Sequence, residues 1–181
     1  MSSVKDARIV RTRQALQQAL LALIERKPFE DISIREIAIE AGVHFATFYR
    51  HHDTKESLLN DIAAEQIISL VELVLPVVYK RDRHDVHLAL CSYVEEHRTL
   101  WKTLLTGGAA GTLKKELMRL CLEPAIERVS KSCDIPVELV VLSTVSVQIE
   151  ALTWWLTQPE GAVSIEALAH MMDRLVYSSL K

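Results

Sequence analysis

The spacing of apolar residues along the chain predicts an all-helical protein. From Val10 to Arg26 the residues Leu16, Leu20, Leu23 and Ile24 recur at three- and four-residue intervals, which marks one face of an amphipathic helix. No segment alternates as a half-buried strand does, and few Gly or Pro residues interrupt the chain. The pattern predicts nine helices, at residues 10–26, 33–41, 44–51, 54–76, 85–98, 99–105, 110–132, 136–157 and 164–180.

Several ends of these helices carry local signals. Ser33 followed by Glu36 has the spacing of a capping box, and Gly42 ends the short helix that begins there. Thr54 alone, or Asp53 with Glu56, can begin the fourth helix. Prolines and glycines mark the remaining boundaries: Lys27-Pro28 ends the first helix, Pro76 the fourth, Gly107-Gly108 forms a turn, and Pro124 is expected to kink the seventh.

The two short helices around Gly42-Val43 have the layout of a helix-turn-helix, whose second helix enters the DNA major groove. Ile37, Val43 and Phe48 are the apolar residues expected to fix the angle between them. An ordinary helical hairpin over residues 33–52 fits the same pattern. The outward-facing residues available for base edges are Phe45, Ala46, Arg50 and His51.

Charge is unevenly distributed along the 181 residues, whose net charge is −3. Residues 1–55 hold nine Lys and Arg against seven Asp and Glu, whereas residues 56–181 hold twelve against seventeen. A mildly basic head on an acidic body suits a protein that touches phosphates with one end only. We therefore expect a DNA-binding domain at 1–55 and a second domain at 56–181.

Several classes of protein are disfavoured by the sequence. No apolar run approaches the roughly 20 residues of a membrane span, and the N-terminus is charged, so we expect a cytoplasmic protein without a membrane partner. There is no Gly-rich phosphate loop, HExxH or GxSxG motif, so neither an enzyme nor a bound cofactor is expected. Three cysteines without CxxC spacing indicate reduced thiols in the core, at Cys91, Cys121 and Cys133.

Residues 9–59 resemble the DNA-binding signature of the TetR family of transcriptional regulators. This resemblance implies an all-helical dimer that binds operator DNA with its N-terminal head and a small effector with the rest. In that family the corresponding Thr, Tyr and Lys bind operator phosphates, a role that Thr47, Tyr49 and Lys55 inherit. The resembling segments are Ile34-Arg35-Glu36-Ile37-Ala38, Ala41-Gly42-Val43, Thr47-Phe48-Tyr49-Arg50-His51 and Lys55-Glu56-Ser57-Leu58-Leu59.

Two residues depart from the family pattern. His44 stands where Ser or Thr commonly begins the recognition helix, and is expected to cap less well while offering a DNA contact. His52 stands where Phe is usual, which predicts a weaker or pH-sensitive junction with the fourth helix. The DNA-contacting set predicted from pattern and resemblance together is Ser33, His44, Phe45, Ala46, Thr47, Tyr49, Arg50, His51 and Lys55.

For some of these side chains the sequence leaves two interpretations open. Phe45 is either exposed, where it suits a thymine methyl, or partly buried against the first helix. Arg50 binds either a guanine edge or a phosphate. Arg8, Arg11 and Arg13 either reach a minor groove or flanking phosphates, or form a solvated basic face.

The resemblance also implies that the last two helices pair with their twofold mates in a four-helix bundle, which sets the two heads roughly 34 Å apart on a palindromic site. An intramolecular core is the competing use of their apolar residues. These residues are Leu139, Leu142, Val145, Ile149 and Leu152, then Ile165, Leu168, Met172, Leu175 and Val176.

An effector pocket is expected among the middle helices of the larger domain, although aromatic and Met residues at helical spacing are more often core. Glu150, inside an apolar run, would pair with a cationic ligand, be satisfied by an Arg, or lie at a solvent-exposed seam. His84, His87 and Cys91 share helical spacing, but an ordinary helix face explains them better than a metal site. The nominated pocket residues are Tyr93, His97, Trp101, Met118, Cys121, Glu150 and Trp154.

The function predicted from these features is a homodimeric repressor that a small effector releases from a palindromic operator. One alternative is a helical ligand-binding or interaction protein whose head has lost DNA binding through His44 and His52. The other is a small helical enzyme, which the missing motifs disfavour.

Overall fold

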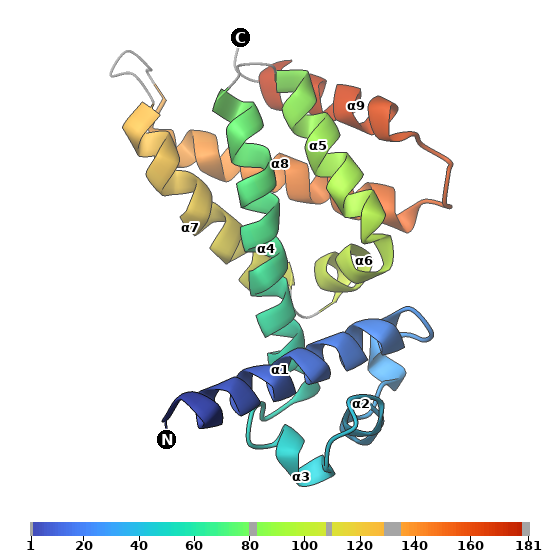
Figure 1. The fold of residues 1–181 in the computed structure, drawn as a ribbon. Helices are drawn as coiled ribbons and strands as arrows, with labels where there is room; N and C mark the ends of the chain where they lie inside the picture. Colours follow the sequence, from blue (N-terminus) through green and yellow to red (C-terminus); the bar gives the residue numbers. More distant parts are fainter. Residues whose placement is uncertain (1, 80–82, 108–109, 129–134, 179–181) are drawn as a thin grey trace. The chain divides into compact units, whose positions relative to one another are not determined.

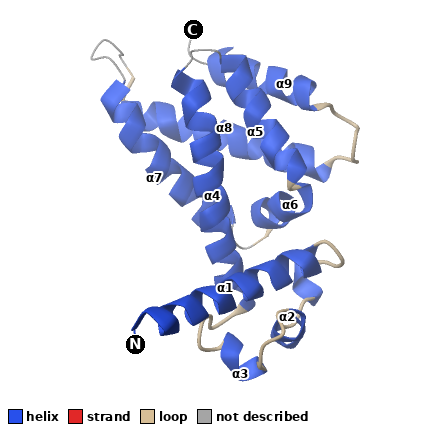
Figure 2. Cartoon of the chain, viewed as in Figure 1, coloured by secondary structure: helices blue, strands red, loops and turns tan. Residues whose placement is uncertain are grey.

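The computed structural model describes residues 2–79, 83–107, 110–128 and 135–178, and within them every regular element is a helix (Figure 2). The prediction of an all-helical fold is confirmed, and the described residues contain the nine predicted α-helices and one 3₁₀ turn, η1. Their bounds are α1 Ser2–Ile24, η1 Phe29–Asp31, α2 Ile34–Glu40, α3 Phe45–Phe48, α4 Lys55–Tyr79, α5 Arg83–Glu96, α6 Arg98–Thr106, α7 Ala110–Arg128, α8 Val137–Thr157 and α9 Ile165–Ser178.

The chain divides into two compact units, Met1–Ala63 and Ala64–Lys181. The expected division at residue 55 coincides with the first residue of α4, and the first unit extends along α4 to Ala63. In the following description each unit is taken by itself.

Several helix boundaries differ from the prediction, and three of them, in α1, α4 and α3, have a clear physical reason. α1 begins at Ser2 rather than Val10, because the polar residues before Val10 lack any helix breaker. α4 continues past Pro76 to Tyr79, since a proline near a helix end removes only one hydrogen bond. α3 is one turn long and ends at Phe48, whereas the prediction extended it to residue 51. After Phe48 the backbone forms tighter turns, in which the His51 N–H donates to the Phe48 carbonyl at 2.9 Å.

In the first unit, α1 extends past α2 and α3 (Figure 1) and packs against α2, which in turn packs against α3. The start of α4 adds a fourth apolar surface. The buried core of this unit includes Leu16, Ala19, Leu20, Leu23, Ile24, Ile32, Ile37, Ala38, Phe48, Leu58, Leu59, Ile62 and Ala63.

In the second unit, α8 packs against α6, α7 and α9, and α5 packs against α9 (Figure 1). The apolar residues predicted on α8 and α9 divide between two environments. One set enters the core: Val145, Ile149, Leu152, Leu168, Met172 and Val176. The other set is exposed: Leu139, Leu142 and Leu175. Ile165 is half-buried.

α8 is long and apolar enough, by length and composition, to pass as a membrane-spanning helix, with a mean hydropathy of 1.5. The sequence-based expectation that no such segment exists therefore needs correction. Its apolar character has a local explanation on one side, where Val145, Ile149 and Leu152 are buried among other helices. The opposite side carries Leu139, Leu142 and Trp154, which are exposed in the single chain.

A buried histidine joins α5 to α8 and α9. His87 is inaccessible to solvent, its Nδ1 lies 2.6 Å from Asp173 Oδ1, and its Nε2 lies 3.1 Å from Gln148 Nε2. With the Gln148 amide donating to Nε2, the imidazole carries its proton on Nδ1 and donates it to the carboxylate. This network satisfies buried polar groups and ties three helices together.

The C-terminal end of α8 is held by Arg98. Its Nη2 donates to the carbonyls of Trp155 and Gln158 at 3.2 and 3.3 Å, and its guanidinium lies 4.7 Å from the centre of the Trp155 ring. The last carbonyls of a helix lack partners within the helix, so a cation there is favourable. α8 is consequently anchored at this end as well as through Gln148.

Gly42 provides a test of this backbone, because its φ of +65° lies in the left-handed region. Gly42→Ala is expected to lower the free energy of unfolding by about 1 kcal/mol, since a Cβ disfavours that region. Gly111→Ala in α7 is the control: a Cβ there meets no atom within 4 Å, so alanine is expected to be neutral or stabilising. Urea unfolding of both variants measures the difference, and equal effects would contradict the assignment.

Candidate nucleic-acid interface

The capping box predicted at the start of α2 is confirmed. The Glu36 backbone N–H donates to Ser33 Oγ at 3.3 Å, and the Ser33 backbone N–H donates to Glu36 Oε2 at 3.0 Å. Lys27 Nζ donates to the other oxygen of Glu36 at 2.7 Å. The Lys27 hydrogen bond, followed by those from Ser33, lowers the pKa of the Glu36 carboxyl to about 2. Ser33 thus caps the start of α2. The residue itself is exposed, and its contact with DNA stays a prediction.

The turn from α2 to α3 is a Schellman motif. The Val43 N–H donates to the Ala38 carbonyl at 2.9 Å and the Gly42 N–H to the Ile39 carbonyl at 3.0 Å. Gly42 occupies the left-handed position that this motif requires. The direction in which the chain enters α3 is therefore set by backbone hydrogen bonds.

One turn of α3 presents a mixed aromatic and basic surface. Phe48 is fully buried and anchors the helix, whereas Phe45 and Tyr49 are 48% and 49% exposed. The rings of Phe45 and Tyr49 meet edge to face with centroids 5.3 Å apart, which holds both side chains outward. Of the two interpretations of Phe45, the exposed one is confirmed. Its contact with a thymine methyl stays a prediction.

The other residues predicted to contact DNA lie on or beside this surface. His44 occupies the N-cap of α3 without a side-chain capping bond, as its substitution for Ser or Thr predicts. Ala46 and Arg50 are exposed, and Thr47 and His51 are half-buried. The predicted residues between His44 and His51, a set that leaves out the buried Phe48, all lie on this segment, and their contacts with DNA stay predictions.

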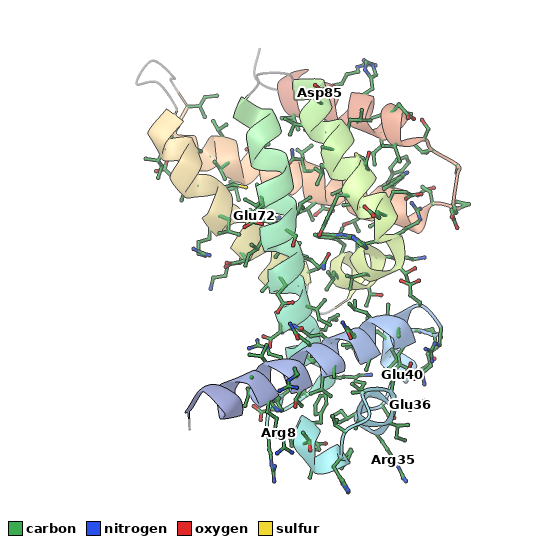
Figure 3. All side chains as sticks on the ribbon, in the orientation of Figure 1. Arg8, Arg35, Glu36, Glu40, Glu72 and Asp85 are labelled. Carbon is green, nitrogen blue, oxygen red and sulfur yellow. The ribbon has the colours of Figure 1, made fainter. Side chains whose placement is uncertain are left out.

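Several arginines of the first unit are exposed and have no carboxylate partner among its described residues: Arg8, Arg11, Arg35 and Arg50. Figure 3 shows Arg8 and Arg35 extending on the side of this unit that carries α3. Arg13 differs, because it forms an ion pair with Asp61. Arg35 was absent from the predicted set. Its position in the first turn of α2, the first helix of the helix-turn-helix, was a signal that could have included it.

Lys55 has a role that the sequence did not predict. Its ammonium donates to the carbonyls of Phe29, Glu30 and Ile32 at 2.8, 2.8 and 2.9 Å, and lies 4.7 Å from the centre of the Phe29 ring. These contacts use all three donors of the ammonium. In this structure the Lys55 side chain therefore connects the start of α4 to η1 through hydrogen bonds. A contact between the Lys55 ammonium and a DNA phosphate would have to compete with these three carbonyls.

His52 is buried in the first unit, in the position where the resemblance implies Phe. Its Nδ1 lies 3.6 Å from Asp61 Oδ2, and its Nε2 is buried without a hydrogen-bond partner in the described part of the chain. Burial lowers the pKa of the imidazole; Arg13 and His51 act in the same direction, while Asp61 and Asp53 oppose them. The neutral form is therefore the one that fits the folded head.

The residues nominated for an effector pocket fall into separate places. Tyr93, His97 and Trp101 form one aromatic cluster, with the Tyr93 ring centroid 5.2 Å from His97 and 6.2 Å from Trp101. Tyr93 donates to Gln66 Oε1 at 2.9 Å. Trp101 is 1% exposed, and its indole N–H has no acceptor among the described residues. Tyr93, His97 and Trp101 are therefore the nominated residues that the structure brings together.

The remaining nominees lie elsewhere. Met118 and Cys121 are half-buried on α7, and burial raises the pKa of the Cys121 thiol. Glu150 and Trp154 are exposed on α8, so of the three interpretations of Glu150 the solvent-exposed seam is the one that the structure supports.

The residues weighed as metal ligands have other environments. Both ring nitrogens of His87 are engaged by Asp173 and Gln148. Cys91 is buried with its pKa raised to about 12, chiefly by burial. The side chain of His84 and all of Cys133 lie outside the described residues.

The role of Lys55 can be tested by Lys55→Met, which keeps the apolar stem and removes the ammonium. Three carbonyls lose their charged donor, so the free energy of unfolding is expected to fall by about 1–3 kcal/mol. Urea unfolding measures it, with Lys102→Met on the exposed surface of α6 as the control. Equal stability of the two variants would mean that the carbonyl contacts are dispensable.

His52 predicts a dependence of stability on pH. Because the folded-state pKa is lowered, the unfolded chain binds the proton more readily, so stability is complete above the unfolded pKa of roughly 6.5 and falls as pH decreases below it. His52→Phe is expected to flatten this loss, and to stabilise the protein near neutral pH by about 1 kcal/mol through removal of the unpaired Nε2.

Urea unfolding at about pH 8 and about pH 5.5 measures this change. The exposed His44→Gln is the control and should keep the wild-type slope. A wild-type slope in His52→Phe would assign the pH dependence to other groups.

Comparison with known proteins agrees with this geometry. Residues 16–62 match the sequence profile described as "Bacterial regulatory proteins, tetR family". An uncharacterized HTH-type transcriptional regulator of Bacillus subtilis (strain 168), YxbF, is 37% identical over 68 residues, which are 37% of this chain. The chain matches only 18% of the length of that relative.

Solved structures resemble the chain over almost its whole length. A TetR transcriptional regulator from Streptococcus agalactiae 2603V has a TM-score of 0.68 and 24% identity, covering 97% of this chain and 99% of that one. Thermus thermophilus FadR, a TetR-family repressor solved with lauroyl-CoA, has a TM-score of 0.67 and 18% identity, covering 93% and 95%. Residues 16–62 are thus similar to the bacterial regulatory proteins of the tetR family, and the chain as a whole shares the fold of solved TetR-family regulators.

Proposed function

We propose that this protein is a transcriptional regulator that binds operator DNA with α3. The observation that carries the proposal is the exposed pair Phe45 and Tyr49 beside Arg50, on a turn of helix that buried Phe48 holds in place. Helix-turn-helix proteins insert such a helix into the major groove. Aromatic side chains can make van der Waals contacts with thymine methyl groups, and a guanidinium can donate hydrogen bonds to guanine or phosphate. This surface therefore carries the side chains that a DNA-binding helix uses.

Phosphate contacts would come from around this helix. Thr47 and Tyr49 keep the role that the family resemblance implies, with their hydroxyls on the α3 segment. The four arginines without carboxylate partners, Arg8, Arg11, Arg35 and Arg50, supply positive charge in the same unit. Lys55 supports the interface through η1, while its backbone N–H, at the first position of α4, stays available to an anion.

We further infer that the protein acts as a homodimer through α8 and α9. Exposed apolar residues gather on these two helices, namely Leu139, Leu142, Trp154, Met171 and Leu175. Large exposed apolar surfaces on one face indicate an interaction site. A twofold dimer would also suit a palindromic operator.

The ligand proposal is a small-molecule effector that contacts the cluster of Tyr93, His97 and Trp101. A buried indole N–H without an acceptor is unfavourable, so a ligand that brings a carbonyl, carboxylate or ether oxygen to Trp101 would satisfy it. Such an effector would release the repressor by favouring a form with lower DNA affinity. The cytoplasm, where DNA and metabolites meet, is the expected location.

The alternative of a head that has lost DNA binding has little support in the two histidines. His44 begins α3 from an exposed position, and His52 is accommodated within the core rather than disrupting it. Neither histidine changes the exposure of the α3 side chains that are proposed to contact DNA.

Binding to DNA is tested by titrating the protein against the DNA upstream of its own gene, at two salt concentrations with random DNA as competitor. Arg50→Ala is expected to weaken specific binding by about 5- to 150-fold, because a guanidinium contact to a base or phosphate is lost. Arg119→Ala is the control, since Arg119 is an exposed arginine on α7. Wild-type binding no tighter than to random DNA would contradict the proposal for this operator, and equal affinities of the two variants would remove Arg50 from the interface.

A further inference from the structure

The exposed seam between α8 and α9 is hollowed along its length. One groove of about 430 Å³ is lined by Val147, Glu150, Trp154, Leu168, Met171 and Leu175. A second groove, of about 150 Å³, shares Val147 and Leu175 with it and continues toward Leu139. The two grooves therefore form one apolar surface, which we call the α8–α9 seam.

Glu150 is chemically unlike the rest of the seam. Among the described residues it is the only charged one that lines either groove, and its neighbours Trp154, Met171 and Leu175 are large and apolar. No ion pair or hydrogen bond of its side chain is found within the described residues. Covering the seam with an apolar partner would strip water from this carboxylate without compensation, which is strongly unfavourable. The occupant must therefore bring a hydrogen-bond donor or a cation.

A second copy of the chain can supply that cation from α9. Among the described residues of α8 and α9, Arg174 is the only Lys or Arg. It is exposed, has no carboxylate partner within the described chain, and follows the seam residue Met171 by three positions and precedes Leu175 by one. Helical spacing therefore sets Arg174 beside Met171, at a rim of the seam. Asp173, the neighbouring acid, is engaged by His87.

Twofold symmetry makes this pairing reciprocal. In an isologous interface both subunits use the same surface, so when residue i of one subunit contacts residue j of the other, j of the first also contacts i of the second. One Glu150–Arg174 contact therefore implies a second, symmetry-related one. We propose that Glu150 of each subunit pairs with Arg174 of the other, and that this double ion pair selects the register and the identity of the partner. The inference rests on the proposed homodimer and adds its specificity. A different regulator that placed an acid opposite Glu150, or a base opposite Arg174, would bring like charges together. Such a partner would therefore bind this seam more weakly.

Reversing the charges tests the pairing without requiring knowledge of operator or effector. Glu150→Arg sets two arginines against each other in both contacts, and Arg174→Glu sets two glutamates against each other. Each variant alone is expected to self-associate at least roughly 100-fold more weakly than wild type, measured by sedimentation equilibrium. When the two variants are mixed, both contacts become attractive, so a heterodimer is expected in native mass spectrometry at concentrations where each alone is monomeric.

The double variant Glu150→Arg with Arg174→Glu restores both pairs within one chain, and is expected to form homodimers but not to pair with wild type. Glu138→Arg, in the first turn of α8 and outside both grooves, is the matched control and should dimerise normally. Circular dichroism verifies that every variant is folded.

The outcomes separate the two proposals. A monomeric wild-type protein would overturn the homodimer itself, and the pairing with it. A wild-type dimer whose single reversed variants still self-associate normally, or whose mixture gives no heterodimer although both chains are folded, would overturn the Glu150–Arg174 pair alone. Normal dimerisation of Arg174→Glu with failure of Glu150→Arg would assign another partner to Glu150, and so also overturn it.

Discussion

The geometry of the candidate interface depends on the burial of Phe48. α3 contains a single turn, and so short a helix has no stability of its own, because the cost of fixing its backbone exceeds the gain from its few hydrogen bonds. Its position is set instead by Phe48 in the core on one side and by the left-handed Gly42 turn on the other. Phe45, Tyr49 and Arg50 are directed outward because these two constraints leave the segment no other face.

Two polar side chains beneath this interface differ in how well they are satisfied. The Lys55 ammonium has three carbonyl acceptors, so it links η1 to α4 at little desolvation cost. His52 instead buries an Nε2 without a partner, beside an Asp61 that is already paired with Arg13. The Lys55 hydrogen bonds thus stabilise the head, while the burial of His52 makes the stability of the head fall as the pH decreases.

The features that could be predicted from the sequence are those determined by neighbours in the chain. The Ser33–Glu36 capping box and the Gly42 turn depend on residues within a few positions, and the helices follow from local periodicity. The contact of Lys55 with residues 29–32 depends on how the chain returns on itself, which periodicity does not encode. For the same reason the nominated pocket residues separated, since helical spacing does not tell which apolar face is inward.

The dimer proposal and the effector proposal meet at α8. One side of this helix is core, through Val145, Ile149 and Leu152, and the other is the α8–α9 seam. Gln148 and the His87–Asp173 pair attach it to α5, and Arg98 attaches its end to α6, the two helices that carry Tyr93 and Trp101. A ligand that binds this aromatic cluster more tightly in one arrangement of α5 and α6 must therefore bias α8 as well. Because linkage is reciprocal, the strength of the Glu150–Arg174 pairing would in turn alter the affinity for the effector. The charge-reversed heterodimer thus becomes the reagent in which ligand binding and subunit pairing can be measured together.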